Sequence, residues 1–370
     1  MNKKLVAALV AGAFAAPIAA QADTNTVTLY GIAQVAASYW DVDAVNGVGG
    51  VAKQGLEDTG SRIGFKGEEQ LGGGMKAFFQ MESGVSLDQG GGTFASREGW
   101  VGLKGNFGGV QLGRGKTVFD LAQEAFDPFN ANSTLINTGL VDGVYYRANN
   151  VIRYTMPEIA GLSGAIEYGD MEGKGTNPSG NGVKPQLIDA SLRYENGPLF
   201  VQGGYEYQKD TRDATAVSDT TTATAVPHKS NAVLIGAGYT LPFGTALAGA
   251  YRHVEVKDSG NKEKRDQFLV NATQPFGNVN VKLGYVHAGN AKGCPDTGCT
   301  LLPADKGADY YIGAVEYNFS KRTWVYLEHA TADNKDNSGL FRTAAVDNLG
   351  NTTYNNGDNR TTSLGIIHLF

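Results

Sequence analysis

The chain of 370 residues carries 31 Lys and Arg against 37 Asp and Glu, which gives a formal net charge of −6 at pH 7. An acidic balance argues against nucleic acid as a partner, because basic surfaces dominate nucleic-acid binding. The chain is rich in glycine, with 51 residues, and contains 17 tyrosines and 16 phenylalanines, but it has no long apolar run after residue 22. This composition fits a secreted β-protein or an outer-membrane β-barrel, and mean hydropathy does not separate the two because barrel strands alternate.

The first 22 residues have the features of a secretory signal peptide. A basic start at Lys3 and Lys4 is followed by a short apolar stretch that ends in Ala20-Gln21-Ala22, an A-x-A cleavage site. We expect cleavage after Ala22, which leaves residues 23–370 as the mature domain with a net charge of −8. The alternative is a membrane anchor helix, and the short apolar run, broken by Pro17, disfavours it.

Sixteen segments read as β-strands separated by turns or loops. In chain order they span residues 26–42, 61–70, 75–87, 95–105, 110–117, 144–156, 162–170, 186–195, 199–209, 230–241, 245–257, 265–275, 279–289, 309–319, 323–332 and 360–370. Seven connections are short turns and eight are long loops, and the two kinds alternate. An even strand number with short turns on one rim and long loops on the other is typical of an outer-membrane barrel. We therefore predict an all-β fold, a 16-stranded antiparallel transmembrane β-barrel, with a centre too wide for side chains to fill.

The alternation of residues within strands supports a barrel with lipid outside and water inside. In the segment 186–195, Ile188 and Leu192 share one face, while Asp189 and Arg193 share the other. A sandwich strand with one buried face remains the alternative for any single strand. The segments 245–257 and 323–332 do not alternate cleanly, so their facing stays open.

The third long loop, residues 118–143, breaks the strand pattern with a helical period. Asp120, Glu124 and Asp127 are four and three residues apart, so a helix aligns them in one stripe. The opposite side carries Val118, Leu121, Ala122, Ala125 and Phe129. Pro128 is expected to end the helix at Asp127. We expect the loop to fold into the barrel and present its acids to water. The alternative is an ordinary exposed amphipathic helix.

Arginines are the candidates for the wall that faces this loop. Alternation turns Arg62, Arg147 and Arg153 inward, and we expect Arg97 to join them. Acids on one side and arginines on the other would create a transverse field at the narrowest point, which favours small polar solutes over apolar ones. The alternative is that all these groups are solvated surface charges. Arg114 falls on an apolar face, so it should lie near a rim or be covered by a neighbouring subunit.

Metal and catalytic sites are not expected. Cys294 and Cys299 form a close pair in a loop with Pro and Gly, which favours a disulfide in an oxidising compartment over a metal site. The five histidines show no ligand spacing, and no cofactor is implied. Asp58-Thr59-Gly60 and Asp296-Thr297-Gly298 look like the halves of an aspartic protease, but both lie in predicted loops rather than at the ends of apolar strands.

Several segments together resemble the trimeric general porins of Gram-negative bacteria, of beta-proteobacterial type. They are Val27-Thr28-Leu29-Tyr30-Gly31, Ser61-Arg62-Ile63-Gly64-Phe65-Lys66-Gly67, Glu68-Glu69-Gln70-Leu71-Gly72-Gly73-Gly74, Val101-Gly102-Leu103-Lys104-Gly105, Gly109-Val110-Gln111-Leu112-Gly113-Arg114 and the terminal Phe370. The resemblance implies a homotrimer in outer-membrane lipid and lipopolysaccharide, a third loop folded into each pore, and passive diffusion of ions and small hydrophilic solutes. It also implies that Arg62 and Arg147 line the constriction and that Phe370 is a barrel-assembly signal. Many porins carry Pro-Glu-Phe-Gly-Gly in this loop, where this chain has Asp127-Pro128-Phe129-Asn130.

We therefore predict an outer-membrane diffusion channel. The alternatives are an outer-membrane barrel enzyme, for which no nucleophile and base are found, and an adhesin whose surface loops bind partners. The mature net charge favours cations, whereas the inward arginines favour anions locally. Charges at the narrowest point should count most, since distant charges are screened within about 8 Å at physiological salt. We expect an anion preference.

Overall fold

The computed structural model describes residues 26–43, 50–129, 135–136, 147–170, 175–176, 182–183, 185–209, 229–258, 260–295, 299, 302, 305–337, 340 and 357–370. The expected signal peptide 1–22 and most of residues 130–146 lie outside the described residues. Within these ranges, no helix combines the length and the hydropathy needed to cross a bilayer.

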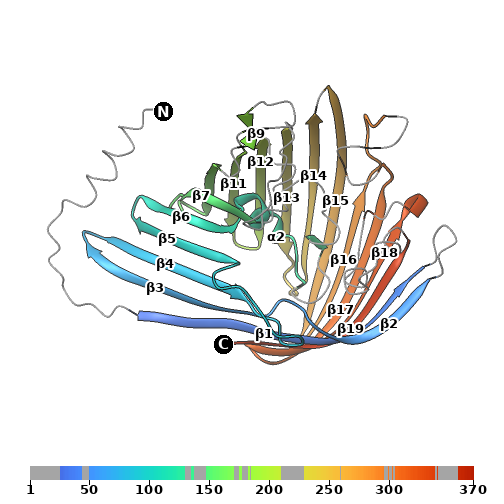
Figure 1. Cartoon of the computed structure of the whole chain (residues 1–370). Helices are drawn as coiled ribbons and strands as arrows, with labels where there is room; N and C mark the ends of the chain where they lie inside the picture. Colours follow the sequence, from blue (N-terminus) through green and yellow to red (C-terminus); the bar gives the residue numbers. More distant parts are fainter. Residues whose placement is uncertain are drawn as a thin grey trace.

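The wall of the molecule is one antiparallel sheet closed into a barrel (Figure 1). Its strands are β1 (Thr26–Val42), β2 (Val51–Asp58), β3 (Arg62–Gly72), β4 (Met75–Gly84), β5 (Glu98–Gly105), β6 (Gly108–Lys116), β7 (Arg147–Thr155), β8 (Leu162–Asp170), β11 (Gln186–Asn196), β12 (Leu199–Lys209), β13 (Lys229–Thr240), β14 (Ala246–Asp258), β15 (Asn261–Phe276), β16 (Val279–Ala288), β17 (Ala308–Ser320), β18 (Thr323–Asn334) and β19 (Asn359–Leu369). Neighbouring strands pair in sequence, and β1 pairs with β19 to complete the ring. A separate small hairpin consists of β9 (Gly175–Thr176) and β10 (Gly182–Val183), and a 3-10 turn, η2 (Lys335–Asn337), follows β18.

β2 and β3 share one position in the ring, so the barrel has the sixteen strand positions that were predicted. Residues 35–42 of β1 pair with β2, and residues 26–32 pair with β3. At the break, the Asp58 carboxylate accepts hydrogen bonds from the backbone N–H groups of Gly60 and Ser61, each at 2.8 Å. The predicted strand 61–70 is therefore only half of this element. β2 was missed because residues 52–58 lack β-branched and aromatic residues.

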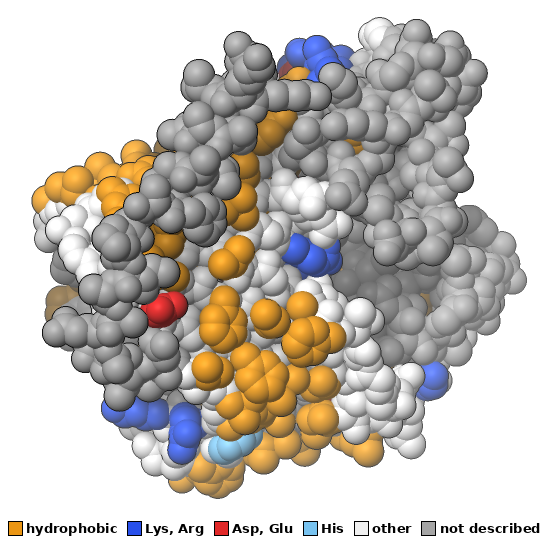
Figure 2. Space-filling model, turned by 60° about the vertical axis from the view of Figure 1, so that its left-hand side comes forward, with side chains coloured by type: hydrophobic (Ala, Val, Ile, Leu, Met, Phe, Trp, Pro, Cys, Tyr) orange, Lys and Arg blue, Asp and Glu red, His pale blue; other side chains and the backbone are white. Residues whose placement is uncertain are grey.

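Side chains alternate between the outside and the inside of the wall. On β7, Ile152 is 51% exposed and Tyr154 is 38% exposed, while Val151 and Arg153 are buried. Figure 2 shows hydrophobic side chains gathered in a broad patch on one face of the molecule, with few charged side chains in it. An apolar outer face over a polar interior is what a lipid-embedded barrel requires.

The chain closes the barrel at its C-terminus, on the rim that carries the short turns. The backbone N–H of Gly31 donates to the carbonyl of Phe370 at 3.0 Å, and the N–H of Phe370 donates to the carbonyl of Gly31 at 3.1 Å. The last residue is therefore hydrogen-bonded into the ring rather than left as a free tail. We refer to this rim as the short-turn rim and to the opposite one as the long-loop rim.

The two cysteines form a disulfide in the long loop after β16. The same loop is held to β15 by Glu263, whose carboxylate accepts a hydrogen bond from the backbone N–H of Leu302 at 2.7 Å. Since the two sulfur atoms are bonded to each other, they fasten the loop and do not serve as metal ligands.

Candidate functional site: the passage beside α2

α2 (Val118–Glu124) starts directly after β6 and lies inside the ring of strands (Figure 1). Thr117 caps its N-terminus, because its Oγ1 accepts a hydrogen bond from the backbone N–H of Asp120 at 3.1 Å. After Glu124 the helix gives way to tighter turns. The N–H groups of Phe126 and Asp127 donate hydrogen bonds to the carbonyls three residues earlier, at 2.9 and 3.1 Å. The helix is thus shorter at its C-terminal end than the predicted one, which extended to Asp127.

The apolar side chains of this loop pack against the inner face of the barrel. Phe119, Phe126 and Phe129 are at most 4% exposed and belong to one hydrophobic cluster with wall residues such as Leu234 on β13 and Leu269 on β15. Burying a side chain of this size contributes about 1.5–3 kcal/mol. The loop is therefore fixed to one side of the interior by hydrophobic burial.

Glycines in the wall make the close approach possible. A Cβ atom at Gly236 on β13 would lie 2.6 Å from Cζ of Phe126. A Cβ atom at Gly284 on β16 would lie 2.9 Å from Cε2 of Phe129 and 2.7 Å from Cδ2 of Leu135. Any larger residue at these two positions would push the loop away from the wall.

Polar side chains of the wall fasten the loop at further points. Their contacts are Arg252 Nη1 to Gln123 Oε1 at 2.7 Å, Asn271 Nδ2 to the Phe126 carbonyl at 2.7 Å, Lys282 Nζ to the Pro128 carbonyl at 2.7 Å, and the Val118 N–H to Glu167 Oε1 at 2.9 Å. Three of the four bonds go to backbone groups of the loop. The position of the loop is therefore specified largely through its main chain, and it does not depend on one particular loop side chain.

A cavity of about 380 Å³ lies between α2 and the opposite wall. Its lining consists of Arg62, Gln80, Glu82, Arg97, Glu98, Trp100, Gln111, Lys116, Leu121, Arg147 and Arg153. All four arginines singled out in the sequence thus surround one space. Five cationic side chains face two carboxylates there, so the lining has an excess of positive charge.

The arginines are held by partners in the wall. Glu82 accepts a hydrogen bond from Arg97 Nε at 2.7 Å and lies 3.9 Å from Arg62 Nε. Arg147 Nε donates to the carbonyl of Arg97 at 3.0 Å and lies 3.8 Å from Glu98. These contacts fix the guanidinium groups in place while leaving more positive than negative charge around the cavity.

Arg153 is the most enclosed of the four. Its Nε donates to Glu167 Oε2 at 2.8 Å, and its guanidinium carbon lies 4.7 Å from the centre of the Trp100 ring. Glu167 also binds the first N–H of α2. Arg153 therefore contributes positive charge to the cavity and also holds the carboxylate that anchors the helix.

The predicted acidic stripe does not line this cavity, which corrects the sequence-based picture. Asp120 is only 3% exposed, and Glu124 pairs with Lys116. Leu121, 44% exposed, faces the cavity instead. The reason is Phe119, which was left out of the predicted apolar side: its complete burial rotates the helix and turns Asp120 toward the protein.

Asp127 also serves the loop itself. Its carboxylate accepts hydrogen bonds from the backbone N–H of Phe129 at 3.0 Å and of Ile136 at 3.1 Å. Burial raises the pKa of Asp127 to about 6, although these backbone hydrogen bonds act in the opposite direction. Asp127 thus closes the turn after α2 and is not among the residues that line the cavity.

Comparison with known proteins decides the class of this molecule. Residues 6–337 match the family described as Gram-negative porin. The chain belongs to this porin family. It is 30% identical over 351 residues to the major outer membrane protein P.IB of Neisseria meningitidis serogroup B, strain MC58, a match that covers 90% of this chain and 96% of that protein.

Two solved structures are similar to this porin. The anion-selective porin from Comamonas acidovorans superposes with a TM-score of 0.75 at 27% identity, covering 94% of this chain and 100% of that one. The outer membrane protein OmpT of Vibrio cholerae, in its trimer form, shares the fold with a TM-score of 0.65 at 17% identity, covering 94% and 100%. This porin is thus an outer-membrane protein that forms a channel for passive diffusion, and its family indicates a channel rather than an enzyme.

Lys116 was missed as a cavity residue because the strand alternation is interrupted before it. The register between β6 and β7 shifts between Gly113 and Gly115. Leu112 faces outward, but Lys116, an even number of residues later, lines the cavity. The same irregularity accounts for the position of Arg114. Its Nε donates a hydrogen bond to the Ser96 carbonyl at 2.9 Å, near the long-loop rim. Since Arg114 is bonded within its own chain, it gives no argument for a neighbouring subunit.

The pH dependence of this porin is predicted from Asp120. Burial raises the pKa of Asp120 to about 7, even though Lys116 and Arg147 nearby act to lower it. Since an exposed Asp titrates near 3.9, the contribution of Asp120 to the stability of the folded porin falls as the pH rises from about 4 to about 7, and this contribution changes no further above that. Ionised Asp120 also places a negative charge beside the cavity, so anion preference should be about twofold weaker at pH 8.5 than at pH 5.5.

Reversal potentials in a KCl gradient at the two pH values test this prediction. The variant Asp120→Asn should keep the preference of the low-pH form at both values. Asp127→Asn is the matched control and should retain the change with pH, because its carboxyl group lies in the turn away from the cavity. A change with pH that survives in Asp120→Asn would assign it to another group.

Proposed function

We propose that this porin lets small anions and anionic hydrophilic solutes pass more readily than cations, through the cavity between α2 and the β3–β7 side of the wall. One observation carries the proposal: five cationic side chains and two carboxylates line this one space. Guanidinium groups stay charged at any physiological pH, and groups this close to a permeating ion are screened less than charges on distant loops. A positive lining lowers the energy of an anion there and raises that of a cation.

The arrangement differs from the simple transverse field expected from the sequence. Glu82 and Glu98 lie among the arginines, while the facing helix offers the apolar Leu121. Of the three loop acids in the predicted stripe, Glu124 is paired with Lys116, and Asp120 and Asp127 are not among the residues that line the cavity. The field is therefore proposed to come from one wall, since no acidic side chain of the described loop residues lines the cavity to balance it.

The selectivity of a similar porin supports this proposal. The porin from Comamonas acidovorans, 27% identical to this chain, is described as anion-selective. Its resemblance covers 94% of this chain. We take this as support for the sign of the selectivity and not for the identity of a natural solute.

Planar-bilayer recording of the purified porin tests the proposed function. Stepwise conductance is expected in symmetric KCl. In a KCl gradient, the reversal potential should have the sign of an anion-preferring channel. Stepwise conductance with a cation-preferring reversal potential would overturn the selectivity and leave the channel intact, and the absence of conductance would overturn both.

We also propose that the channel is a homotrimer surrounded by outer-membrane lipid. The Vibrio cholerae OmpT structure is described as a trimer form and shares this fold. The broad hydrophobic outer face provides the surface that subunits and lipid would cover (Figure 2). Native mass spectrometry of the detergent-solubilised porin should give three times the mass of the mature chain, and a monomer mass would contradict the trimer.

A further inference from the structure

Aromatic rings lie flat against the inner wall of the barrel at three places on the β1–β7 flank. Two of these rings cover a glycine on the neighbouring strand. A Cβ atom at Gly64 would lie 2.4 Å from Cζ of Tyr30, and a Cβ atom at Gly102 would lie 2.7 Å from Cζ of Phe78. Because glycine has no side chain, one face of each ring rests on the backbone of the wall, and the other face is turned toward the interior.

The third ring is that of Trp100, which lies over Gly115 in the same way. It is only 5% exposed, and the guanidinium group of Arg153 covers it. Tyr30 and Phe78, in contrast, are half-buried, so part of each ring is open to the interior. These two rings are therefore the ones that a solute can reach.

Tyr30 and Phe78 continue the lining of the cavity toward the short-turn rim. Gln80 lines the cavity, and its Nε2 donates a hydrogen bond to the hydroxyl of Tyr30 at 2.7 Å. Phe78 is two residues from Gln80 on β4, so it shares the inward face and lies about 7 Å further toward the turn that joins β3 and β4. A solute that leaves the cavity toward this rim passes both rings.

A lysine lies over each of the two rings. Lys66 Nζ is 5.2 Å from the centre of the Tyr30 ring, and Lys104 Nζ is 5.6 Å from the centre of the Phe78 ring. Both separations are within the range of about 6 Å over which a cation attracts an aromatic face. Since an ammonium group has three donors, each lysine can bind an anion in addition to its present contacts.

Positive charge exceeds negative charge along this stretch of wall. Between the cavity and the short-turn rim, the inner face of β3, β4 and β5 carries Lys66, Lys76 and Lys104 against Glu68. Glu68 is paired with Lys76 at 3.4 Å and also with Lys104. One carboxylate does not balance three ammonium groups, so this stretch attracts anions as the cavity does.

We propose that this surface, called here the aromatic track and made of Tyr30, Lys66, Phe78 and Lys104, favours aromatic carboxylates among the anions that enter the channel. The carboxylate binds a lysine ammonium group, and the ring of the solute packs beside Tyr30 or Phe78 in an offset or edge-to-face arrangement. An aliphatic carboxylate makes the charged contact without the pairing of rings. The inference rests on the proposed passage of anions and adds the class of solute.

Reversal potentials across a planar bilayer test the aromatic track, with chloride on one side and an organic anion on the other. The two probes are benzoate and cyclohexanecarboxylate, which have the same charge and the same number of carbon atoms, whereas only benzoate is aromatic. In the unmodified porin, benzoate should be at least about threefold more permeant. Equal permeability of the two probes would overturn the proposal without the need for any variant.

The variant that combines Tyr30→Leu and Phe78→Leu keeps apolar side chains and removes both rings. Its preference for benzoate should fall by at least about twofold. Tyr30→Phe keeps the ring and should retain the preference, and so should Phe65→Leu, which removes a ring on the outward face of β3. A preference that survives the loss of both inner rings, or that falls equally in Phe65→Leu, would overturn the track.

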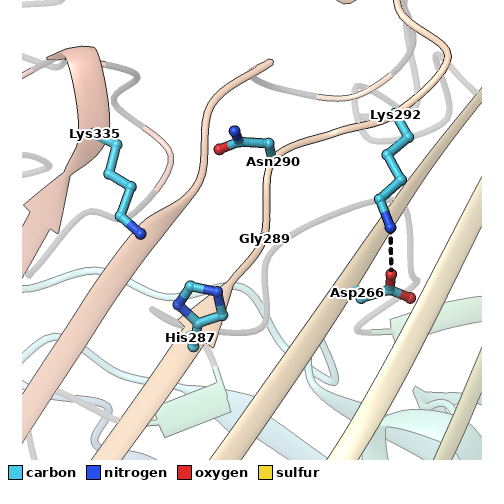
Figure 3. Close-up of a pocket in the computed structure, with 6 residues that line it drawn as sticks. All are labelled: Asp266, His287, Gly289, Asn290, Lys292 and Lys335. Carbon is cyan, nitrogen blue, oxygen red and sulfur yellow. Dashed lines mark hydrogen bonds and ion pairs between the residues drawn. The ribbon is translucent and has the colours of Figure 1, made fainter.

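Replacement of Lys66 and Lys104 by glutamine tests the charged part of the track. The permeability of both carboxylates relative to potassium should fall by at least about threefold. The control combines Lys292→Gln and Lys335→Gln. Figure 3 shows these two lysines at a pocket of about 290 Å³, which shares no lining residue with the cavity. The control should leave both permeabilities unchanged, and an unchanged permeability in the test variant would contradict the role of the lysines.

The reversal potential in a KCl gradient separates this result from a failure of the proposed function. The variant that lacks both rings should keep the preference of the unmodified porin for chloride over potassium, because the rings carry no charge. A preference for potassium in the unmodified porin would overturn the proposed anion selectivity. The comparison of benzoate with cyclohexanecarboxylate would still decide the aromatic track, since the two probes carry equal charge.

Discussion

Replacing Arg62 and Arg147 together by glutamine is expected to remove most of the anion preference of the channel. Both side chains line the cavity, and their loss leaves three cationic groups against the carboxylates of Glu82 and Glu98. In water, a unit charge about 5 Å from a passing ion contributes about 0.8 kcal/mol. Two such groups raise the energy of an anion by about 1.6 kcal/mol and lower that of a cation by as much, so the anion-to-cation permeability ratio should fall by at least about tenfold.

The reversal potential in a KCl gradient measures this ratio directly. Arg322→Gln is the control, because Arg322 is exposed in the short turn between β17 and β18 and is not among the residues that line the cavity. It should leave the ratio unchanged. If the double variant kept the preference of the unmodified porin, the arginines would not face the route taken by ions.

Replacing Phe126 and Phe129 together by alanine is expected to release the loop from the wall. Both rings are buried in the hydrophobic cluster, and a buried Phe→Ala change costs about 3–5 kcal/mol in typical cores. The remaining hydrogen bonds to the loop backbone, such as that from Asn271 to the Phe126 carbonyl, compete with water once the apolar contact is lost. A released loop should obstruct the channel less and should move.

Single-channel recordings should therefore show a larger and noisier conductance in this variant. Phe319→Ala, which removes a ring exposed on the outer side of β17, is the matched control and should give the conductance of the unmodified porin. Retention of the barrel is checked by circular dichroism. An unchanged conductance in a folded double variant would show that the loop does not narrow the passage.

The fold was predictable because each strand needs only a local rule, the alternation between lipid and interior. That rule gave the strand positions except β2, and it gave the inward facing of Arg153. It failed where the interior is apolar. On β14 and β18 the loop cluster buries inward residues such as Val254 and Ala330, so both faces of these strands contain apolar side chains. Their facing could not be read from the sequence because the partner lies far away in the chain.

The candidate site was predictable in part for the same reason. Arg62 and Arg153 follow from alternation within regular strands, and the structure places them at one cavity. The inward facing of Lys116 could not be predicted, because it follows a register shift that no local sequence pattern indicates. The orientation of Asp120 depends on how deeply Phe119 enters the wall, which is a property of tertiary packing. Whether these groups form the constriction stays a prediction for the measurements above.

The loop is attached to the wall from β8 through β18, and on the proposed route this makes the conducting path eccentric. On the proposed route, solutes travel along one flank of the cylinder, and the inner surface of the other flank holds the loop in place. Exchange of an inward residue there, such as Leu234 or Leu269, should alter how firmly the loop is seated and leave the order of preferred solutes intact. A solute that carries both charges would, on such a route, travel with its acidic end turned toward β3–β7.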